Sequence, residues 1–306
     1  MKNKDKLKKR FKRSLPLYLM MLPGILYLFI NNYMPMAGIM VAFKKYSAQQ
    51  GIWNSKWIGF SNFEYLFKND AYILIRNTLL YNVAFIILDL FFGIVIAILI
   101  TDVVSTKARK LYQSAILLPF LLSIVIVSYI VYAFLSAENG MFNAVRGSLG
   151  MEPVQWYASP QYWPFILCFV HVWKGVGYGC LIYIAGIAGI DPALFEAAKL
   201  DGASKWQQIR YVTLPDLVPS IITLLLLNVG HIFNSDFGLF YQVPQNSGML
   251  YSVTNTIDTY VYRALMTAGG IGRSSAAGVF QSVVGFVLVV LSNLIVRKTN
   301  KENAIF

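Results

Sequence analysis

The sequence has little charge for its length. Of its 306 residues, 13% are charged and 57% are hydrophobic, whereas a typical soluble domain has about 25% charged residues. A soluble protein covers its surface with charged side chains, so this shortage argues against an ordinary soluble enzyme or binding domain. It indicates that much of the chain lies in lipid, and we predict an all-α integral membrane protein.

The sequence is also poor in residues that carry catalysis. His171 and His231 are its two histidines, and neither belongs to a motif that binds a metal or activates a nucleophile. Cys168 and Cys180 share one apolar run, about 18 Å apart along a helix, which is too far for a disulfide. No Gly-x-x-x-x-Gly-Lys-Ser/Thr loop is present. We therefore expect no catalytic residue, metal or cofactor in this chain, and no ATP hydrolysis by the chain alone.

Acidic residues are scarce relative to basic ones, with 14 against 26 and a net charge of +12. Eight of the basic residues lie between Lys2 and Arg13, directly before an apolar run from Leu17 to Ile30. This arrangement suits the anionic inner face of a membrane, and no nucleic-acid-binding motif accompanies the charge. No small-residue cleavage site follows the run, so we read it as an uncleaved first span.

The chain contains six apolar segments long enough, or nearly so, for a membrane helix of about 20 residues. These segments are residues 16–33, 77–100, 112–135, 163–187, 217–235 and 275–296. Lys and Arg are enriched in cytoplasmic loops, and with both termini inside, 17 of them lie in inner segments against eight outside. We predict a basic cytoplasmic tail (1–15), a six-span domain (16–298) and a cytoplasmic C-terminal tail (299–306) in the cell membrane.

The predicted external loops are longer than simple turns require. Residues 36–76 and 236–274 are rich in aromatic and polar residues, and residues 136–162 contain apolar positions at helical spacing from Met141 to Leu149. Aromatic side chains of this kind pack at the level of the lipid headgroups, which makes membrane lipids one expected contact. A docking surface for an external partner is the second interpretation.

The loop at 188–216 is the long one on the predicted inner side. Asp191 is a good N-cap for a helix that begins at Pro192, and Gly202 permits a left-handed turn. Ser204 caps a second short helix that runs to about Val212, and Pro215 ends that helix or lies at its exit. The local pattern predicts a helix–turn–helix below the membrane, either a coupling element or a simple connection between two spans.

Several positions in this loop match a known pattern. Glu196-Ala197-Ala198, Gly202 and Leu214-Pro215 have the spacing of the signature loop of binding-protein-dependent (type I) ABC importer permeases, and Val212 replaces the usual isoleucine. The chain resembles that family from about residue 15 to 298. Trp57 to Phe63, Asn77-Thr78, Thr259 to Arg263 and Ala276 to Asn293 resemble its carbohydrate branch, in particular the subgroup that handles complex oligosaccharides.

The resemblance implies a six-span permease of MetI-like architecture that imports oligosaccharides by alternating access. It implies that the loop docks on a cytoplasmic ABC ATPase dimer, which binds the ATP and Mg. The residues that match the coupling element or lie within it are Glu196, Ala197, Ala198, Asp201, Gly202, Leu214 and Pro215. A second, homologous but different permease subunit and an extracellular solute-binding protein complete the expected assembly.

Polar groups inside the bilayer are costly, so each is a candidate for the substrate pathway. Lys174 and Asp89 both fall near the middle of their spans, where they either pair with each other or leave Lys174 facing the substrate. Asn228, His231 and Asn234 are three residues apart, which places them on one face of a helix. The full set of candidates is Tyr129, Tyr132, Trp173, Lys174, Tyr178, Asn228, His231, Asn234 and Asp236.

Two alternatives to an oligosaccharide importer stay open at this point. An ion-coupled secondary transporter would use His231, Asp236 and Asp89 as ion-binding groups, although it leaves the loop pattern unexplained and no inverted repeat is visible. An ABC importer permease for a solute other than a sugar would have the same signature loop but a substrate cavity of different chemistry. An intramembrane enzyme is not supported, because no catalytic pair stands at a suitable spacing.

Overall fold

The computed structural model describes residues 2–68, 71–267 and 270–299, and the predicted tail at 300–306 lies outside them. The helices and strands before residue 141 are α1 (Lys2–Leu28), a π-helical turn (Phe29–Tyr33), a 3-10 helix (Met34–Phe43), β1 (Lys44–Lys45), α2 (Gly51–Asn54), β2 (Lys56–Trp57), α3 (Ser61–Lys68), α4 (Ala71–Thr101), α5 (Thr106–Leu121) and α6 (Ile124–Leu135).

The second half of the chain is also helical. Its elements are α7 (Met141–Ser148), two 3-10 turns (Trp156–Ala158 and Pro160–Tyr162), α8 (Trp163–Gly189), α9 (Pro192–Leu200), α10 (Lys205–Gln208), a π-helical segment (Ile209–Thr213), α11 (Leu214–Gly230), α12 (Phe237–Gln242), a 3-10 turn (Gly248–Leu250), α13 (Tyr251–Thr254), α14 (Ile257–Met266) and α15 (Ile271–Thr299). The predicted all-α class is therefore confirmed, with one short β-ribbon added.

The chain divides into two compact units. The first consists of Met1–Leu66 and Ala264–Val279. In it β1 pairs antiparallel with β2, and Lys44 stands opposite Trp57. The side-chain amide of Asn62 donates hydrogen bonds to the carbonyls of Ala42 and Lys44, at 2.9 and 3.0 Å. The ribbon is therefore held directly at the end of the first apolar segment.

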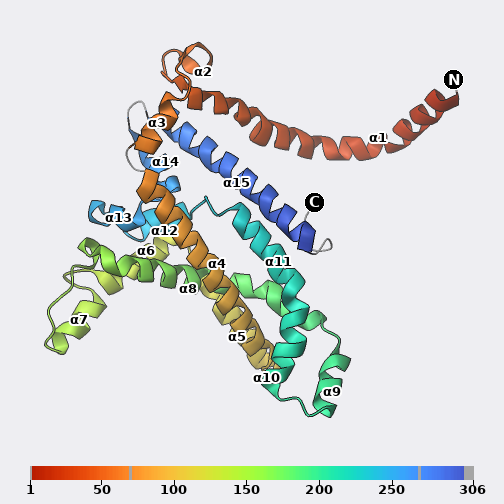
Figure 1. Cartoon of the computed structure of the whole chain (residues 1–306), viewed down its shortest axis with the longest axis vertical. Helices are drawn as coiled ribbons and strands as arrows, with labels where there is room; N and C mark the ends of the chain where they lie inside the picture. The colour runs from red at the N-terminus through yellow and green to blue at the C-terminus, as the bar shows by residue number, and fades with distance from the viewer. Residues whose placement is uncertain (1, 69–70, 268–269, 300–306) are drawn as a thin grey trace. The chain divides into compact units, whose positions relative to one another are not determined.

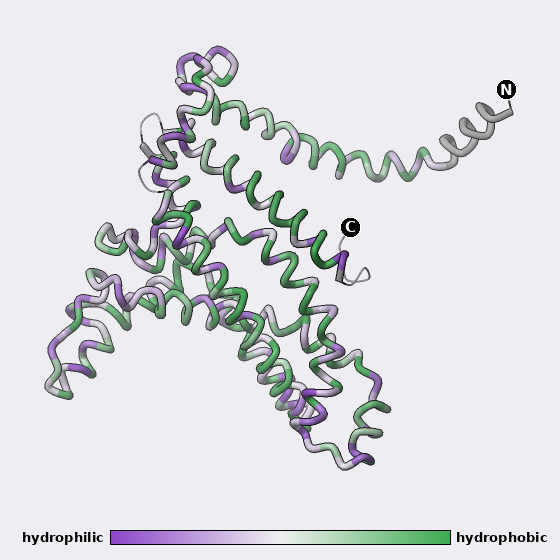
Figure 2. Tube along the Cα trace, viewed as in Figure 1, coloured by the Kyte–Doolittle hydropathy of each residue, from purple (hydrophilic) through white to green (hydrophobic). Residues whose placement is uncertain are grey.

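Five apolar helical segments in the described residues are long enough to cross a membrane, and a sixth is bent. The continuous segments are Ser14–Phe43, Ala71–Thr101, Pro160–Gly189, Lys205–Gly230 and Ile271–Lys298. Figure 2 shows α4 and α11 as largely hydrophobic along their length, with hydrophilic residues gathered at the connection between α9 and α10. The six predicted segments each overlap one of these helices or the bent pair.

The predicted span over 112–135 is not one continuous helix. The structure has α5 and α6 instead, bent by 93° at Leu122 and Ser123. Both residues have extended backbone, with ψ of 136° and 147°, and the Ser123 hydroxyl accepts a hydrogen bond from the Ile126 amide at 3.3 Å. Pro119, in the last turn of α5, cannot donate to the helical ladder. A serine cap just after a proline is therefore enough to end one helix and start another.

The second unit, Phe67–Arg263 with Phe280–Phe306, has its core around α8, which crosses behind α4 in Figure 1. Its largest cluster of buried side chains includes Trp163, Leu167, Phe240 and Val127. Small residues allow close approach inside the membrane, where hydrophobicity alone does not drive helices together. A methyl group at Gly177 would collide with the carbonyl of Ile116, so α8 and α5 are in contact there.

The fifth span ends earlier than predicted. We expected a helix over 217–235, but α11 ends at Gly230, and His231, with φ −102° and ψ 10°, caps it. The next residues turn away: the Ser235 backbone N–H donates to Asp258 at 2.6 Å, and Asp236 caps α12 by accepting from the Leu239 N–H at 3.1 Å. These polar partners outside the helix explain why the chain stops being helical.

Candidate functional site

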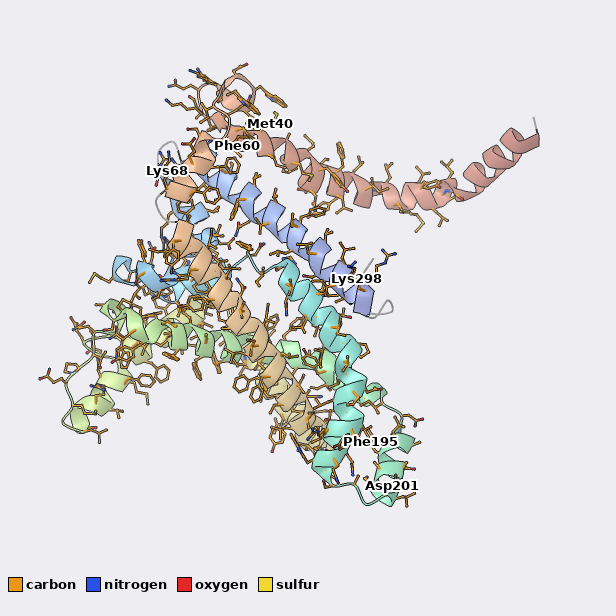
Figure 3. All side chains as sticks on the ribbon, viewed as in Figure 1. Met40, Phe60, Lys68, Phe195, Asp201 and Lys298 are labelled. Atoms are coloured by element: carbon orange, nitrogen blue, oxygen red, sulfur yellow. The ribbon has the colours of Figure 1, made fainter. Side chains whose placement is uncertain are left out.

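The hairpin between α8 and α11 folds as its local sequence predicts. The Asp191 carboxylate accepts a hydrogen bond from the Ala193 N–H at 2.9 Å and caps α9. Gly202 has φ +77°, the left-handed conformation that favours glycine. Ser204 then caps α10 in a reciprocal capping box with Gln207. Figure 3 shows Phe195 and Asp201 on α9 and at the turn that follows it.

The second arm of the hairpin differs from the prediction. Pro215 does not end the helix, because α10, the π-helical segment and α11 form one continuous helical run from Lys205 to Gly230. The Leu214 N–H bonds to the Ile209 carbonyl, five residues back, and Pro215 follows as an early residue of α11. Such a π-helical turn accommodates the missing proline N–H without breaking the run. The hairpin is thus joined to the fifth span by an uninterrupted helix.

The motif residues lie on the open side of this hairpin. Glu196, Ala197, Asp201, Gly202 and Pro215 are exposed, while Ala198 and Leu214 are half-buried. A Cβ added to Gly202 would meet nothing within 4 Å. The small side chains therefore leave a low surface that another protein backbone can approach closely.

The inner side of the hairpin faces the end of α4. The Lys205 ammonium lies 2.7 Å from the Asp102 carboxylate, in the turn after α4. Phe195, Lys199 and Thr101 line a small cavity of about 220 Å³ between them. The buried Gln208 donates to the Ala203 carbonyl at 3.0 Å. The hairpin is consequently held against α4 as well as continuous with α11.

A second candidate site is a cavity of about 280 Å³ between α4, α8 and α11. Its wall is mostly apolar, but Asp89, His171 and Asn228 are among the lining residues, and we call it the polar cavity for these groups. The Nε2 atom of His171 lies 3.0 Å from an oxygen of Asp89. The His171 ring also stacks on Phe85, with 3.7 Å between centroids and 5° between planes. Tyr178 stacks on Phe120 at 4.6 Å and 9°. The lining residues include Asp89, Phe120, His171, Gly175, Tyr178, Gly179, Tyr183 and Asn228.

This arrangement bears on the two interpretations of Lys174. Its pairing with Asp89, the first interpretation, does not form, since Asp89 is paired with His171. Lys174 instead donates to the Phe120 carbonyl at 3.1 Å, and its ammonium lies 5.4 Å from the centroid of the Phe120 ring. Lys174 is thus bound at the end of α5, beside the cavity and not among its lining residues.

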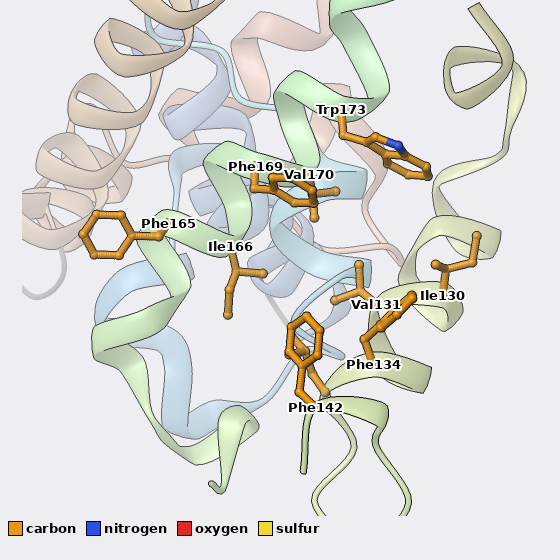
Figure 4. A pocket seen from close by; sticks show the side chains of 10 residues that line it. Ile130, Val131, Phe134, Phe142, Phe165, Ile166, Phe169, Val170 and Trp173 are labelled. Atoms are coloured by element: carbon orange, nitrogen blue, oxygen red, sulfur yellow. The ribbon is translucent and has the colours of Figure 1, made fainter. Parts of the chain in front are cut away.

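The other pathway candidates are dispersed. Tyr178 and Asn228 line the polar cavity, whereas Trp173 lines an apolar pocket on another side of α8 (Figure 4). Tyr132 packs against Tyr157, with 5.7 Å between ring centroids, and Tyr129 is 65% exposed. Because α11 ends at Gly230, the predicted stripe of Asn228, His231 and Asn234 on one helix does not form. Asp236 caps α12.

Sequence reasoning missed His171. The signal was available, because a titratable side chain in an apolar run near the depth of Asp89 is itself a candidate partner. The residue was weighed only as a metal ligand or a catalytic base. The periodicity of α8 also helps, since His171, Gly175, Tyr178 and Gly179 share one face of that helix.

The stretch from Thr259 to Arg263, in the loop between α11 and α15, is fixed by contacts of the Arg263 side chain. The Arg263 guanidinium lies 3.9 Å above the Tyr251 ring and donates to Asn246 at 3.1 Å and to Asn255 at 2.5 Å. Burial lowers the pKa of Arg263, and the neighbouring Tyr251 opposes that change. These contacts make the stretch a packing element of the loop.

Comparisons with known proteins agree with the hairpin motif. A family model described as "Binding-protein-dependent transport system inner membrane component" matches residues 76–301. Protein LplB of Bacillus subtilis (strain 168) is 34% identical over 95% of this chain and 91% of the relative. The polygalacturonan/rhamnogalacturonan transport system permease protein YteP of the same organism is 34% identical over 94% of this chain and 89% of the relative.

A solved structure matches over nearly the full length. One chain in the crystal structure of a bacterial ABC transporter involved in the import of the acidic polysaccharide alginate has a TM-score of 0.88. It is 34% identical, and the match covers 96% of this chain and 99% of that chain. The permease architecture that the hairpin motif predicts is therefore confirmed. The chain belongs to the family of inner membrane components of binding-protein-dependent transport systems.

Proposed function

We propose that this chain is a permease subunit of an ATP-driven importer for oligosaccharides, with its hairpin at 191–215 as the contact for the ATPase. The observation that carries the proposal is the hairpin itself. Most of its motif residues are exposed, and its second arm continues without interruption into the fifth span. An element of that kind transmits a push on its tip directly to a membrane helix.

The geometry supports a lever that moves two spans together. The helical run from Lys205 connects the hairpin to α11, and the Lys205–Asp102 pair links it to the end of α4. Closure of an ATPase dimer against the hairpin would displace both helices. Because α4 and α11 flank the polar cavity, the same motion would alter access to it, as alternating access requires.

The proposed assembly contains a second, different permease, a cytoplasmic ATPase dimer and an extracellular solute-binding protein. A solved structure of the alginate transporter is in complex with a pentasaccharide-bound periplasmic protein, which supports the last of these. The excess of Lys and Arg in the tail and in the 101–111 and 188–216 loops supports cytoplasmic termini.

An oligosaccharide is the substrate that both the relatives and the cavity favour. The names of the relatives include polygalacturonan, rhamnogalacturonan and the acidic polysaccharide alginate. The polar cavity offers an exposed Tyr178 ring, the Asn228 amide and an Asp89 oxygen that accepts no hydrogen bond from any described residue. Sugars present C–H faces to aromatic rings and hydroxyls to such planar polar groups.

The test is uptake by the complex purified with its partners and reconstituted in vesicles. We expect an ATPase to co-purify and a labelled oligogalacturonide, presented with the binding protein, to enter only when ATP is hydrolysed. Ala197→Trp should abolish uptake, because the large ring prevents close docking. Val104→Trp is the matched control, since Val104 is 95% exposed in the neighbouring turn but outside the hairpin.

Three results would each contradict a part of the proposal. Uptake driven by a proton or sodium gradient without ATP would assign the chain to secondary transport. Normal ATP-driven uptake by the Ala197→Trp complex would remove the hairpin from the coupling contact. ATP-driven uptake of a different class of solute under the same conditions would support the importer assignment but exclude an oligosaccharide as the substrate.

A further inference from the structure

An apolar pocket of about 600 Å³ lies between α6, α7 and α8, apart from the polar cavity. Figure 4 shows side chains of α8 on one side and side chains of α6 and α7 on the other. The residues that line it are Ile130, Val131, Phe134, Leu135, Phe142, Phe165, Ile166, Phe169, Val170 and Trp173. No charged, hydroxyl or amide side chain is among them, so the pocket does not suit a sugar.

Two of the helices that form the pocket belong to candidate membrane-spanning segments. Phe165 to Trp173 belong to the first half of α8, a helix long and apolar enough to cross a membrane. Ile130 to Leu135 belong to the second arm of the bent pair. The medium that meets these residues in a bilayer is acyl chain. The Trp173 indole N–H is the one hydrogen-bonding side-chain group among the lining residues, and a single donor is too few to hold a water favourably. The occupant must therefore be apolar.

Helix α7 closes one end of the pocket and lies outside the spanning segments. Met141, Phe142 and Val145 are each about half-exposed, at 55%, 47% and 48%, although α7 is not itself long enough to span. A short helix with exposed apolar residues and a cationic side chain is suited to the level of the headgroups. Phe142, which lines the pocket, marks the end nearest that level.

Arg146 provides a charge at the same end. It follows Phe142 by four residues on α7, so the two side chains share a face of that helix. Its Nε donates to the Glu152 carbonyl at 3.0 Å, which fixes the direction of the guanidinium. No carboxylate among the described residues forms an ion pair with Arg146, and its terminal nitrogens donate to none of them.

We propose that the pocket binds one acyl chain of an anionic phospholipid whose phosphate contacts Arg146. An acyl chain satisfies the apolar lining, and the guanidinium matches a phosphate in charge and geometry. A purely apolar membrane helix of another subunit would satisfy the lining but would leave the charge of Arg146 without an anion. The site is separate from the hairpin and from the polar cavity, so it does not depend on the substrate.

The test uses Trp173 as a built-in reporter, because its ring lines the pocket. The full chain in its assembled complex is reconstituted in phosphatidylcholine vesicles that contain dibrominated phosphatidylglycerol or dibrominated phosphatidylcholine. Bromine quenches nearby tryptophan, and subtraction of the Trp173→Phe complex isolates the Trp173 signal. We expect dibrominated phosphatidylglycerol to reach half-maximal quenching of that signal at a mole fraction about fivefold lower than dibrominated phosphatidylcholine does. One cation near an anionic lipid surface contributes about 1 kcal/mol, which corresponds to this ratio.

Two variants, each with a matched control, test whether the quenching comes from lipid bound at this pocket. Arg146→Gln should remove the preference for phosphatidylglycerol, whereas Lys56→Gln, in the β-ribbon of the other unit, should not. Ile130→Phe should fill the pocket and weaken quenching by both lipids. Val125→Phe adds the same ring to α6, outside the residues that line the pocket, and should have no effect.

Either of two outcomes overturns the proposal. Equal quenching by the two lipids in the wild-type complex would show contact with bulk lipid and no anionic site. Absence of quenching by both would show that another protein surface covers the pocket in the complex.

Discussion

The ammonium of Lys174 on α8 donates a hydrogen bond to the carbonyl oxygen of Phe120, 3.1 Å away, in the last turn of α5. The last carbonyls of a helix lack intrahelical partners, and α5 ends inside an apolar segment where water is scarce. A cation at a helix C-terminus also interacts favourably with the helix dipole. Lys174 thus has a structural task that explains its place in the membrane: it stabilises the break between α5 and α6.

Replacement of Lys174 tests that task. Lys174→Met should lower the unfolding free energy by about 1–2 kcal/mol, because it leaves the Phe120 carbonyl without its charged donor. The measurement is thermal unfolding of the purified complex in lipid nanodiscs. Lys107→Met, a substitution in the first turn of α5 where Lys107 has no such partner among the described residues, is the control. If stability is unchanged while the KM for oligosaccharide rises, Lys174 acts on the substrate instead.

The Asp89–His171 pair predicts non-additive effects. Asp89→Asn and His171→Gln should each destabilise the protein, and the double variant should cost about 1 kcal/mol less than the sum of the two, because the first substitution already removes the shared contact. Unfolding of the four proteins in one detergent completes the cycle. Additive costs would mean that the 3.0 Å contact contributes no coupling energy.

Gly202 predicts a coupling defect without a folding defect. Gly202→Val places a β-branched residue at φ +77°, which costs about 1–2 kcal/mol at the turn. The turn is exposed, so we expect normal insertion and assembly, but ATP hydrolysis that no longer depends on the loaded binding protein. Gly189→Val is the control, because Gly189 has an ordinary φ and open space around it at the end of α8, just before the hairpin. Normal coupling in Gly202→Val would show that the turn geometry does not matter to the ATPase contact.

At Gly177 we predict a loss of stability, in contrast to the coupling defect expected at Gly202. Gly177→Ala should destabilise the protein by about 1–3 kcal/mol, since its methyl group would meet the Ile116 carbonyl and push α5 away from α8. Gly179→Ala, two residues later with open space around it, should be nearly neutral in the same thermal unfolding assay. Equal melting temperatures for the two variants would indicate that α5 and α8 are less closely packed than the structure shows.

Some of the fold and site follows from local sequence alone. The caps at Asp191 and Ser204 are confirmed, and Gly202 adopts the left-handed conformation that its sequence position permits. The helix Met141–Ser148 falls where apolar residues recur at helical spacing. Each depends on interactions within a few residues, which a sequence displays directly. The apolar helices are equally local, because the cost of an unsatisfied backbone in lipid forces a long apolar run to be helical.

Pairings between distant segments could not be predicted in the same way. Asp89 had two candidate partners within three residues on α8, Lys174 and His171, and both fall near the middle of the membrane. Helix rotation decides between them, and rotation depends on packing of all neighbouring helices. The same reasoning explains Tyr178 and Trp173, which are five residues apart on α8 yet line different pockets.

The sequence by itself determined that this chain is a membrane protein with a hairpin that carries the motif of the importer family, because composition, capping residues and motif spacing are local properties. The tertiary structure decided where the third apolar segment bends, where the fifth ends, and which polar groups meet inside the membrane. Those outcomes depend on hydrogen bonds such as Ser235 to Asp258 and Lys174 to Phe120, whose partners are brought together only when the helices pack.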